Sequence, residues 1–197
     1  MIKAIIFDCF GVVLANTSRE HMALFDRTDP EKAENLRAIS RAADHGILSR
    51  QEALEQTGEI LGITAAELLR REDEGEVKNQ PLLDFIETLR PQYRVAMLSN
   101  VSGRDRLDIR FDPNELNDRF DVVIASGDEG YIKPEQEIYE IAAARLGVAP
   151  QECVMIDDIE LFCNGARATG MQAIQFLETQ QAIADLGQLI DNTSKTD

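Results

Sequence analysis

The chain has 197 residues, 44% of them hydrophobic and 28% charged, which suffices for one compact domain with a hydrophobic core. A formal net charge of −16 repels phosphate backbones and anionic lipid, so neither nucleic acid nor a membrane surface is an expected partner. Asp8 interrupts the first apolar run too early for a secretion signal, and no run is long enough to span a membrane. With three cysteines that lack paired spacing, these features predict a cytoplasmic protein with free thiols.

Short apolar runs alternate with helical patterns along most of the chain. Five runs are predicted to be buried strands: Ile2–Phe7, Tyr93–Leu98, Asp121–Ala125, Cys153–Ile156 and Met171–Phe176. Helical patterns cover residues 81–89, 134–146, 161–169 and 179–190. Apolar runs without alternation are typical of strands covered on both faces, so we expect an α/β fold with a Rossmann-like parallel sheet of about five strands and helices on both faces.

The region between the first two predicted strands has a different character. Ser49 and Thr64 are each followed by glutamate three residues later, which is the signature of a capping box at a helix start. Pro30 fits the first turn of another helix. We therefore expect a small all-helical cap over residues 16–80, inserted into a core formed by residues 1–15 and 81–197.

Polar side chains stand where the predicted strands end or just beyond. In an open parallel sheet the ligand site lies beyond the carboxyl ends of the strands. The side chains that meet there are three carboxylates, a hydroxyl, an amide and an amine: Asp8, Ser99, Asn100, Lys133, Asp157 and Asp158. We expect them to form one site.

Three neighbouring acids cannot all stay ionised beside one lysine unless their pKa values shift or a cation binds. Oxygen ligands suit a hard ion such as Mg²⁺. A metal together with Lys133 could neutralise an incoming phosphate, which Asp8 could attack to give an aspartyl-phosphate. Gly11 fits a sharp turn that exposes backbone N–H groups to that phosphate.

Four segments resemble, in order, the four motifs of the haloacid dehalogenase-like (HAD) hydrolase superfamily: Ile5-Ile6-Phe7-Asp8, Leu98-Ser99-Asn100, Lys133-Pro134-Glu135 and Ile156-Asp157-Asp158. The helical region between the first two is similar to the subfamily with a small helical cap. The resemblance implies a Mg²⁺-dependent phosphatase of small phosphorylated metabolites.

The resemblance also implies a role for each matching residue. Asp8 is expected to be the nucleophile and a metal ligand, and Lys133 to bridge the nucleophile and the phosphate. Ser99 and Asn100 are expected to bind the transferring phosphoryl group. The remaining metal ligands are expected to be the carboxylates of Asp157 and Asp158 and the carbonyl oxygen of Phe10.

Two positions depart from the pattern. Phe10 replaces the aspartate that usually serves as general acid, and Phe162 replaces an Asn or Asp that often supports the lysine or the metal. Phe10 favours a 2-haloacid dehalogenase-type hydrolase instead, but the acidic pair Asp157-Asp158 is atypical of that branch and would repel a haloacid carboxylate. A catalytically degenerate binding protein is a further alternative. Arg104 and Arg106, soon after the second motif, are expected on a solvated face, with contact to substrate as the alternative.

Overall fold

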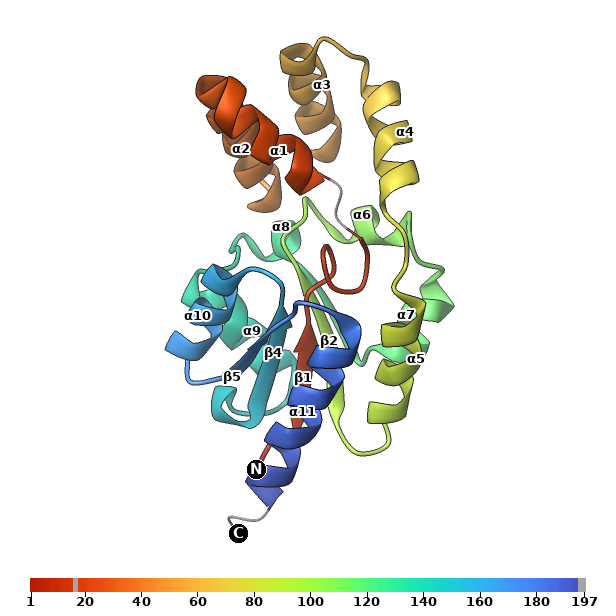
Figure 1. The fold of residues 1–197 in the computed structure, drawn as a ribbon, viewed down its shortest axis with the longest axis vertical. Helices are drawn as coiled ribbons and strands as arrows, with labels where there is room; N and C mark the ends of the chain where they lie inside the picture. Colours follow the sequence, from red (N-terminus) through yellow and green to blue (C-terminus); the bar gives the residue numbers. More distant parts are fainter. Residues whose placement is uncertain (16–17, 195–197) are drawn as a thin grey trace.

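The structure is a computed structural model that describes residues 1–15 and 18–194. It has an α/β fold built on one five-stranded parallel sheet, in the order β3-β2-β1-β4-β5 (Figure 1). The strands are β1 Ala4–Phe7, β2 Arg94–Ser99, β3 Val122–Ala125, β4 Cys153–Asp157 and β5 Gln172–Gln175. Their limits lie within two residues of the predicted ones, so the predicted sheet is confirmed.

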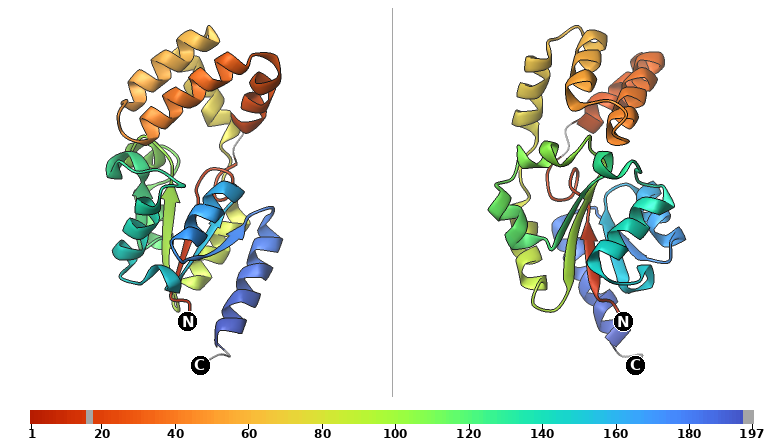
Figure 2. Two further views of the ribbon diagram at one scale, coloured as in Figure 1. Left: turned by 90° about the vertical axis from the view of Figure 1, so that its left-hand side faces the viewer. Right: turned by 180° about the vertical axis from the view of Figure 1, so that it is seen from behind.

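Helices cover both faces of the sheet, which explains why its central strands are apolar throughout. One face carries α9 (Gln136–Leu146) and α10 (Glu160–Ala168), and the other carries α5 (Gln80–Leu89), α7 (Pro113–Arg119) and α11 (Thr179–Ser194) (Figures 1 and 2). Successive residues of β1 enter opposite layers: Ala4 and Ile6 pack towards α9, and Ile5 and Phe7 towards α5.

Four helices between β1 and β2 stand beyond the carboxyl ends of the strands, and we call them the cap helices (Figures 1 and 2). They are α1 Ser18–Thr28, α2 Pro30–Asp44, α3 Arg50–Leu61 and α4 Ala65–Gly75. Ser49 and Glu52 form both hydrogen bonds of the predicted capping box, and the Thr64 hydroxyl accepts from the Glu67 amide. The division into core and cap stays a prediction, and its boundary at residue 16 lies outside the described residues.

Some elements differ from the prediction. The helix expected from Pro134 begins at Gln136, because the backbone before it is held in the site described below. The helices α1 and α7 and the short helices α6 (Arg104–Asp108), α8 (Ser126–Glu129) and η1 (Pro150–Glu152) were not predicted. The three cysteines are unpaired and buried, as expected. Among the described residues, no helix has the length and apolar character needed to cross a bilayer.

Candidate active site

The parallel pairing of β1 with β4 brings two carboxylates together at one edge of the sheet. Phe7 lies opposite Ile156, and the Asp8 amide donates a 2.9 Å hydrogen bond to the Ile156 carbonyl. Asp8 and Asp157, the next residues along, therefore leave the sheet side by side. Both are buried, with 5% and 0% of their surfaces exposed. The Cys9 amide donates to Asp8 Oδ1 at 2.7 Å, which fixes the orientation of that carboxylate.

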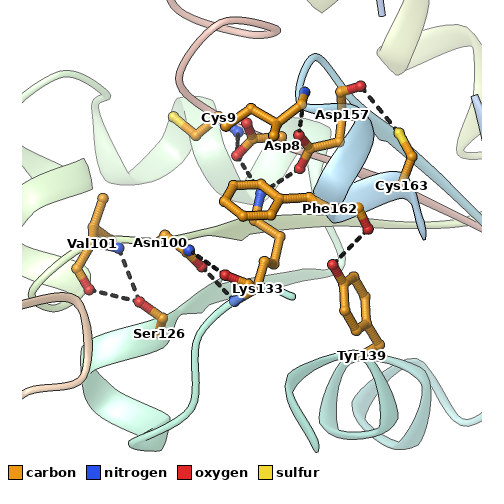
Figure 3. A network of polar contacts seen from close by, with 11 residues as sticks. Asp8, Cys9, Asn100, Val101, Ser126, Lys133, Tyr139, Asp157, Phe162 and Cys163 are labelled. Atoms are coloured by element: carbon orange, nitrogen blue, oxygen red, sulfur yellow. Dashed lines mark hydrogen bonds and ion pairs between the residues drawn. The ribbon is translucent and has the colours of Figure 1, made fainter. Parts of the chain in front are cut away.

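Lys133 lies between these two acids (Figure 3). Its Nζ is 2.8 Å from Asp8 Oδ1 and 2.6 Å from Asp157 Oδ2, and only 1% of the residue is exposed. The Asn100 carboxamide holds the Lys133 backbone on both sides: its Nδ2 donates to the Lys133 carbonyl at 3.0 Å, and its Oδ1 accepts from the Lys133 amide at 2.8 Å. The Asn100 side chain thus positions Lys133, and its expected contact with substrate stays a prediction.

The buried acids of this site and Lys133 shift one another's pKa values. Burial, assisted by the negative charges of Asp157 and Asp158, raises the pKa of Asp8 to about 7 although Lys133 opposes the rise. Burial alone would lower the pKa of Lys133, but the charges of Asp8 and Asp157 outweigh it and raise that pKa above its ordinary value. Lys133 is shared by Asp8 and Asp157, and the carboxylate of Asp158 lies beside them, so the cluster is suited to a further cation.

The arrangement of the three acids fits a divalent metal ion. One carboxylate oxygen each from Asp8, Asp157 and Asp158 lies within 4.8 Å of the others. Gly11 has a φ of +104°, and a Cβ there would come within 1.9 Å of Asp158 Oδ2. The absence of a side chain at Gly11 therefore lets Asp158 approach the loop that carries Asp8. Clustered carboxylates close to a backbone loop are the donors that Mg²⁺ prefers.

Ser99 is the last residue of β2, the strand that pairs with β1 on its other side. Its unsatisfied hydroxyl also indicates a bound ligand. The residue is 1% exposed, and its hydroxyl has no hydrogen-bond partner among the described residues. A buried polar group without a partner costs about 1–3 kcal/mol, so it requires an explanation. A phosphoryl oxygen held beside Asp8 and Lys133 would satisfy the Ser99 hydroxyl.

Both unusual phenylalanines stack against cations. The Lys133 ammonium lies 5.1 Å from the centre of the Phe162 ring, and the Arg106 guanidinium lies 4.9 Å from that of Phe10. The prediction of a solvated Arg106 is wrong: the residue is 9% exposed and is paired with Glu76 in the segment between α4 and α5. No local sequence pattern predicts the pair between Arg106 and Glu76, because the two residues are 30 positions apart.

Sequence reasoning also missed the contact that joins the cap helices to this edge of the sheet. The Ser126 hydroxyl, at the start of α8, donates to the Asp44 carbonyl at 2.6 Å and accepts from the Val101 amide at 3.0 Å. The only signal was a serine directly after the third predicted strand, and such residues are common helix starts.

The chain matches the family model of haloacid dehalogenase-like hydrolases over residues 2–160, and a second, HAD-hydrolase-like model over residues 131–193. It is similar to the phosphatase MT3486 of Mycobacterium tuberculosis, with 36% identity over 91 residues, or 44% of this chain and 40% of that protein. It is 27% identical to the putative phosphatase YhcW of Bacillus subtilis over 88% of this chain and 83% of YhcW. The chain thus spans less than half of the mycobacterial relative but most of YhcW.

Solved structures share the fold. The HAD family enzyme BT-2542 of Bacteroides thetaiotaomicron, in complex with magnesium and inorganic phosphate, superposes with a TM-score of 0.73 at 22% identity, over 89% of this chain and 94% of that one. The L-2-haloacid dehalogenase of Xanthobacter autotrophicus gives 0.63 at 21% identity, over 94% and 82%. With a family model that covers most of its length, the four motifs in order and the helical insertion after β1, this chain belongs to the haloacid dehalogenase-like hydrolases.

Proposed function

We propose that this protein is a Mg²⁺-dependent phosphatase that hydrolyses small phosphorylated metabolites through an aspartyl-phosphate on Asp8. The observation that carries the proposal is the buried lysine ammonium shared by two of three clustered carboxylates. Such a set can take a cation and then a phosphate dianion. The phosphatase names of two relatives, and the magnesium and phosphate bound to BT-2542, support the same reading.

Each residue has a role in this proposal. Asp8, Asp157 and Asp158, with the carbonyl oxygen of Phe10, would hold Mg²⁺, which when bound would offset the charge of the phosphate. Ser99 would donate its otherwise unpartnered hydroxyl to a phosphoryl oxygen, and Lys133 would hold another while it orients Asp8. A carboxylate oxygen of Asp8 would attack phosphorus and release the alcohol, and water would then cleave the aspartyl-phosphate.

Dehalogenation is the second candidate, because Phe10 favours it. A haloacid carries its own carboxylate, and without a metal it would meet three clustered acids beside the ammonium of Lys133. That electrostatic repulsion opposes binding, whereas a metal-loaded site attracts anions. The charge of the site therefore ranks phosphatase above dehalogenase.

The test is phosphate release from a panel of phosphorylated metabolites, with Mg²⁺ and with EDTA. We expect EDTA to abolish release, Mg²⁺ to restore it, and Asp8→Asn to remove it while the protein stays folded. Chloride release from 2-chloropropionate that persists in EDTA would transfer the assignment to the dehalogenase. Inactivity on every substrate would favour the degenerate binding protein. The cytoplasmic location stays a prediction from sequence.

A further inference from the structure

The alcohol that leaves a phosphate ester must take up a proton, and position 10 cannot supply it. The Phe10 ring is held beneath Arg106, whose guanidinium is paired with Glu76 and lies 3.4 Å from Glu72. This part of the site is therefore committed to packing and to an ion-pair network. If the protein is the phosphatase proposed above, the proton has to come from another group or from water.

The cap helices also bring Asp44 to this edge of the sheet. The last residue of α2 and the first two residues of the turn that follows, residues 44–46, lie directly on the core (Figure 2). The Asp44 carbonyl accepts from Ser126 at 2.6 Å, and His45 Nδ1 is 3.2 Å from the Gly130 carbonyl oxygen. The backbone of Gly46 is so close that a Cβ there would meet the Gly127 carbonyl oxygen at 2.3 Å. The position of Asp44 relative to the core is thus fixed by three consecutive residues.

The contacts of Asp44 lead directly to the phosphate-binding residues of the proposed function. Ser126, which holds the Asp44 carbonyl, also bonds the amide of Val101 (Figure 3). Val101 follows Asn100, whose side chain fixes Lys133. The Asp44 side chain is half-buried, and its carboxyl group has no hydrogen bond or ion pair with any other described residue. It is therefore available for a ligand.

The surroundings of Asp44 keep its proton available near neutral pH. Burial raises the pKa of Asp44 to about 6, although the neighbouring His45 and Lys133 act to lower it. Acids on the neighbouring elements are engaged elsewhere: Glu135 lies 3.5 Å from His45, Glu129 pairs with Arg145, and Asp128 accepts from the Arg104 amide. A general acid is most effective when its pKa lies close to the working pH.

We propose that Asp44, presented by the cap helices, is the general acid and base of this enzyme in place of the residue missing at position 10. As the bond from Asp8 to phosphorus forms, the ester P–O bond breaks, and its electron pair takes the proton of the Asp44 carboxyl. In the second half-reaction the Asp44 carboxylate removes a proton from the attacking water. The bond between Asp8 and phosphorus breaks, inorganic phosphate leaves, and both aspartates return to their starting states.

The test compares Asp44→Asn with the natural protein on ethyl phosphate and 4-nitrophenyl phosphate, in Mg²⁺, across pH 5 to 9. Asparagine keeps the carbonyl that Ser126 holds, so the turn should stay docked. We expect kcat/KM on ethyl phosphate to fall by about 10²–10⁴-fold, the usual contribution of a general acid. The aryl ester, whose leaving group needs little protonation, should lose less than about tenfold. The decline of kcat/KM above about pH 6 should disappear in the variant.

The matched control is Asp26→Asn, the same chemical change at a cap residue that is exposed and paired with Arg37. This variant should leave kcat/KM on both esters, and its dependence on pH, unchanged. Asp44→Glu should keep the alkaline decline at reduced rate, which tests the carboxyl even if the asparagine variant folds poorly. Equal losses on both esters with an unchanged profile would overturn the role of Asp44 alone. Inactivity of the natural protein on every phosphate would instead remove the proposed function, and this inference with it.

Discussion

Lys133→Met should strongly destabilise the metal-free protein at alkaline pH. The Lys133 ammonium is 2.8 Å from Asp8 and 2.6 Å from Asp157, and all three residues are at most 5% exposed. Methionine keeps an unbranched side chain of similar length but leaves two carboxylates buried without a counter-ion. Removing one partner of a buried ion pair costs about 3–5 kcal/mol. Because whole domains are stable by about 5–15 kcal/mol, the variant should lose a large share of its stability.

The loss of stability in Lys133→Met should increase with pH. The pKa of Asp8 is already raised to about 7 with Lys133 present, and without the ammonium it would rise further. At pH 5.5 Asp8 is therefore protonated in the variant, and one of the two uncompensated charges is absent. The difference in the free energy of unfolding between natural and variant protein should be largest near pH 8 and clearly smaller at pH 5.5.

Urea unfolding followed by circular dichroism, in EDTA at both pH values, measures this difference. The control is Lys78→Met, which removes a 2.6 Å pair with Glu115 in which the lysine is about one-third exposed. Exposed pairs contribute about 0–1 kcal/mol, so this variant should stay close to the natural protein at both pH values. A Lys133→Met loss no larger than the control's, or equal at both pH values, would refute the charge balance derived from the structure.

Three further predictions concern the same site. Asp8→Asn should stabilise the metal-free protein by a few kcal/mol above pH 7 and leave its stability unchanged near pH 4. The raised pKa of Asp8 means that the protonated carboxyl stabilises the fold fully at low pH, and that this contribution is lost as the pH rises through about 7. Urea unfolding across this pH range measures the difference, and a variant less stable than the natural protein at pH 8 would contradict the prediction. Gly11→Ala should displace Asp158 and so weaken Mg²⁺ binding, measured by calorimetry, at least about tenfold. The control is Gly62→Ala, at a φ of +68° with no atom within 4 Å of the new Cβ. It should lower stability by only about 1–2 kcal/mol and leave Mg²⁺ affinity unchanged. Ser99→Ala should leave the melting temperature unchanged or higher but weaken inhibition by inorganic phosphate about tenfold, since the hydroxyl loses no partner among the described residues; a clear drop in melting temperature would show that it is already bonded.

The sheet and the acidic cluster could be predicted because both follow from short-range patterns. Apolar runs such as Ile5–Phe7 and Val154–Ile156 fix the strands, and parallel pairing then brings the next residues, Asp8 and Asp157, to one edge. The Ser49 capping box likewise marks α3 without any knowledge of its neighbours. In each case a local preference and the final fold agree.

The contacts that set the finer chemistry could not be predicted, since each joins segments that are distant in sequence. Phe10 meets Arg106 across the sheet edge, and Asp44 meets Ser126 across 82 residues. Helices α6 and α8, with five and four residues, are too short to show a helical period. They nevertheless orient Arg106 and Ser126. The residues that distinguish this chain from the usual family pattern are thus placed by tertiary packing.

The charges of the proposed site also connect metal, substrate and proton donor. With Lys133 and Mg²⁺ present, the three clustered acids would be neutralised, so a phosphate dianion could enter without strong repulsion. That dianion would then be a negative charge close to Asp44, and a neighbouring negative charge raises the pKa of a carboxyl group. Substrate binding would therefore keep the Asp44 proton in place until the ester bond breaks. The bound phosphate would thus raise the pKa of Asp44 and keep it protonated, so that it can serve as the general acid that position 10 lacks.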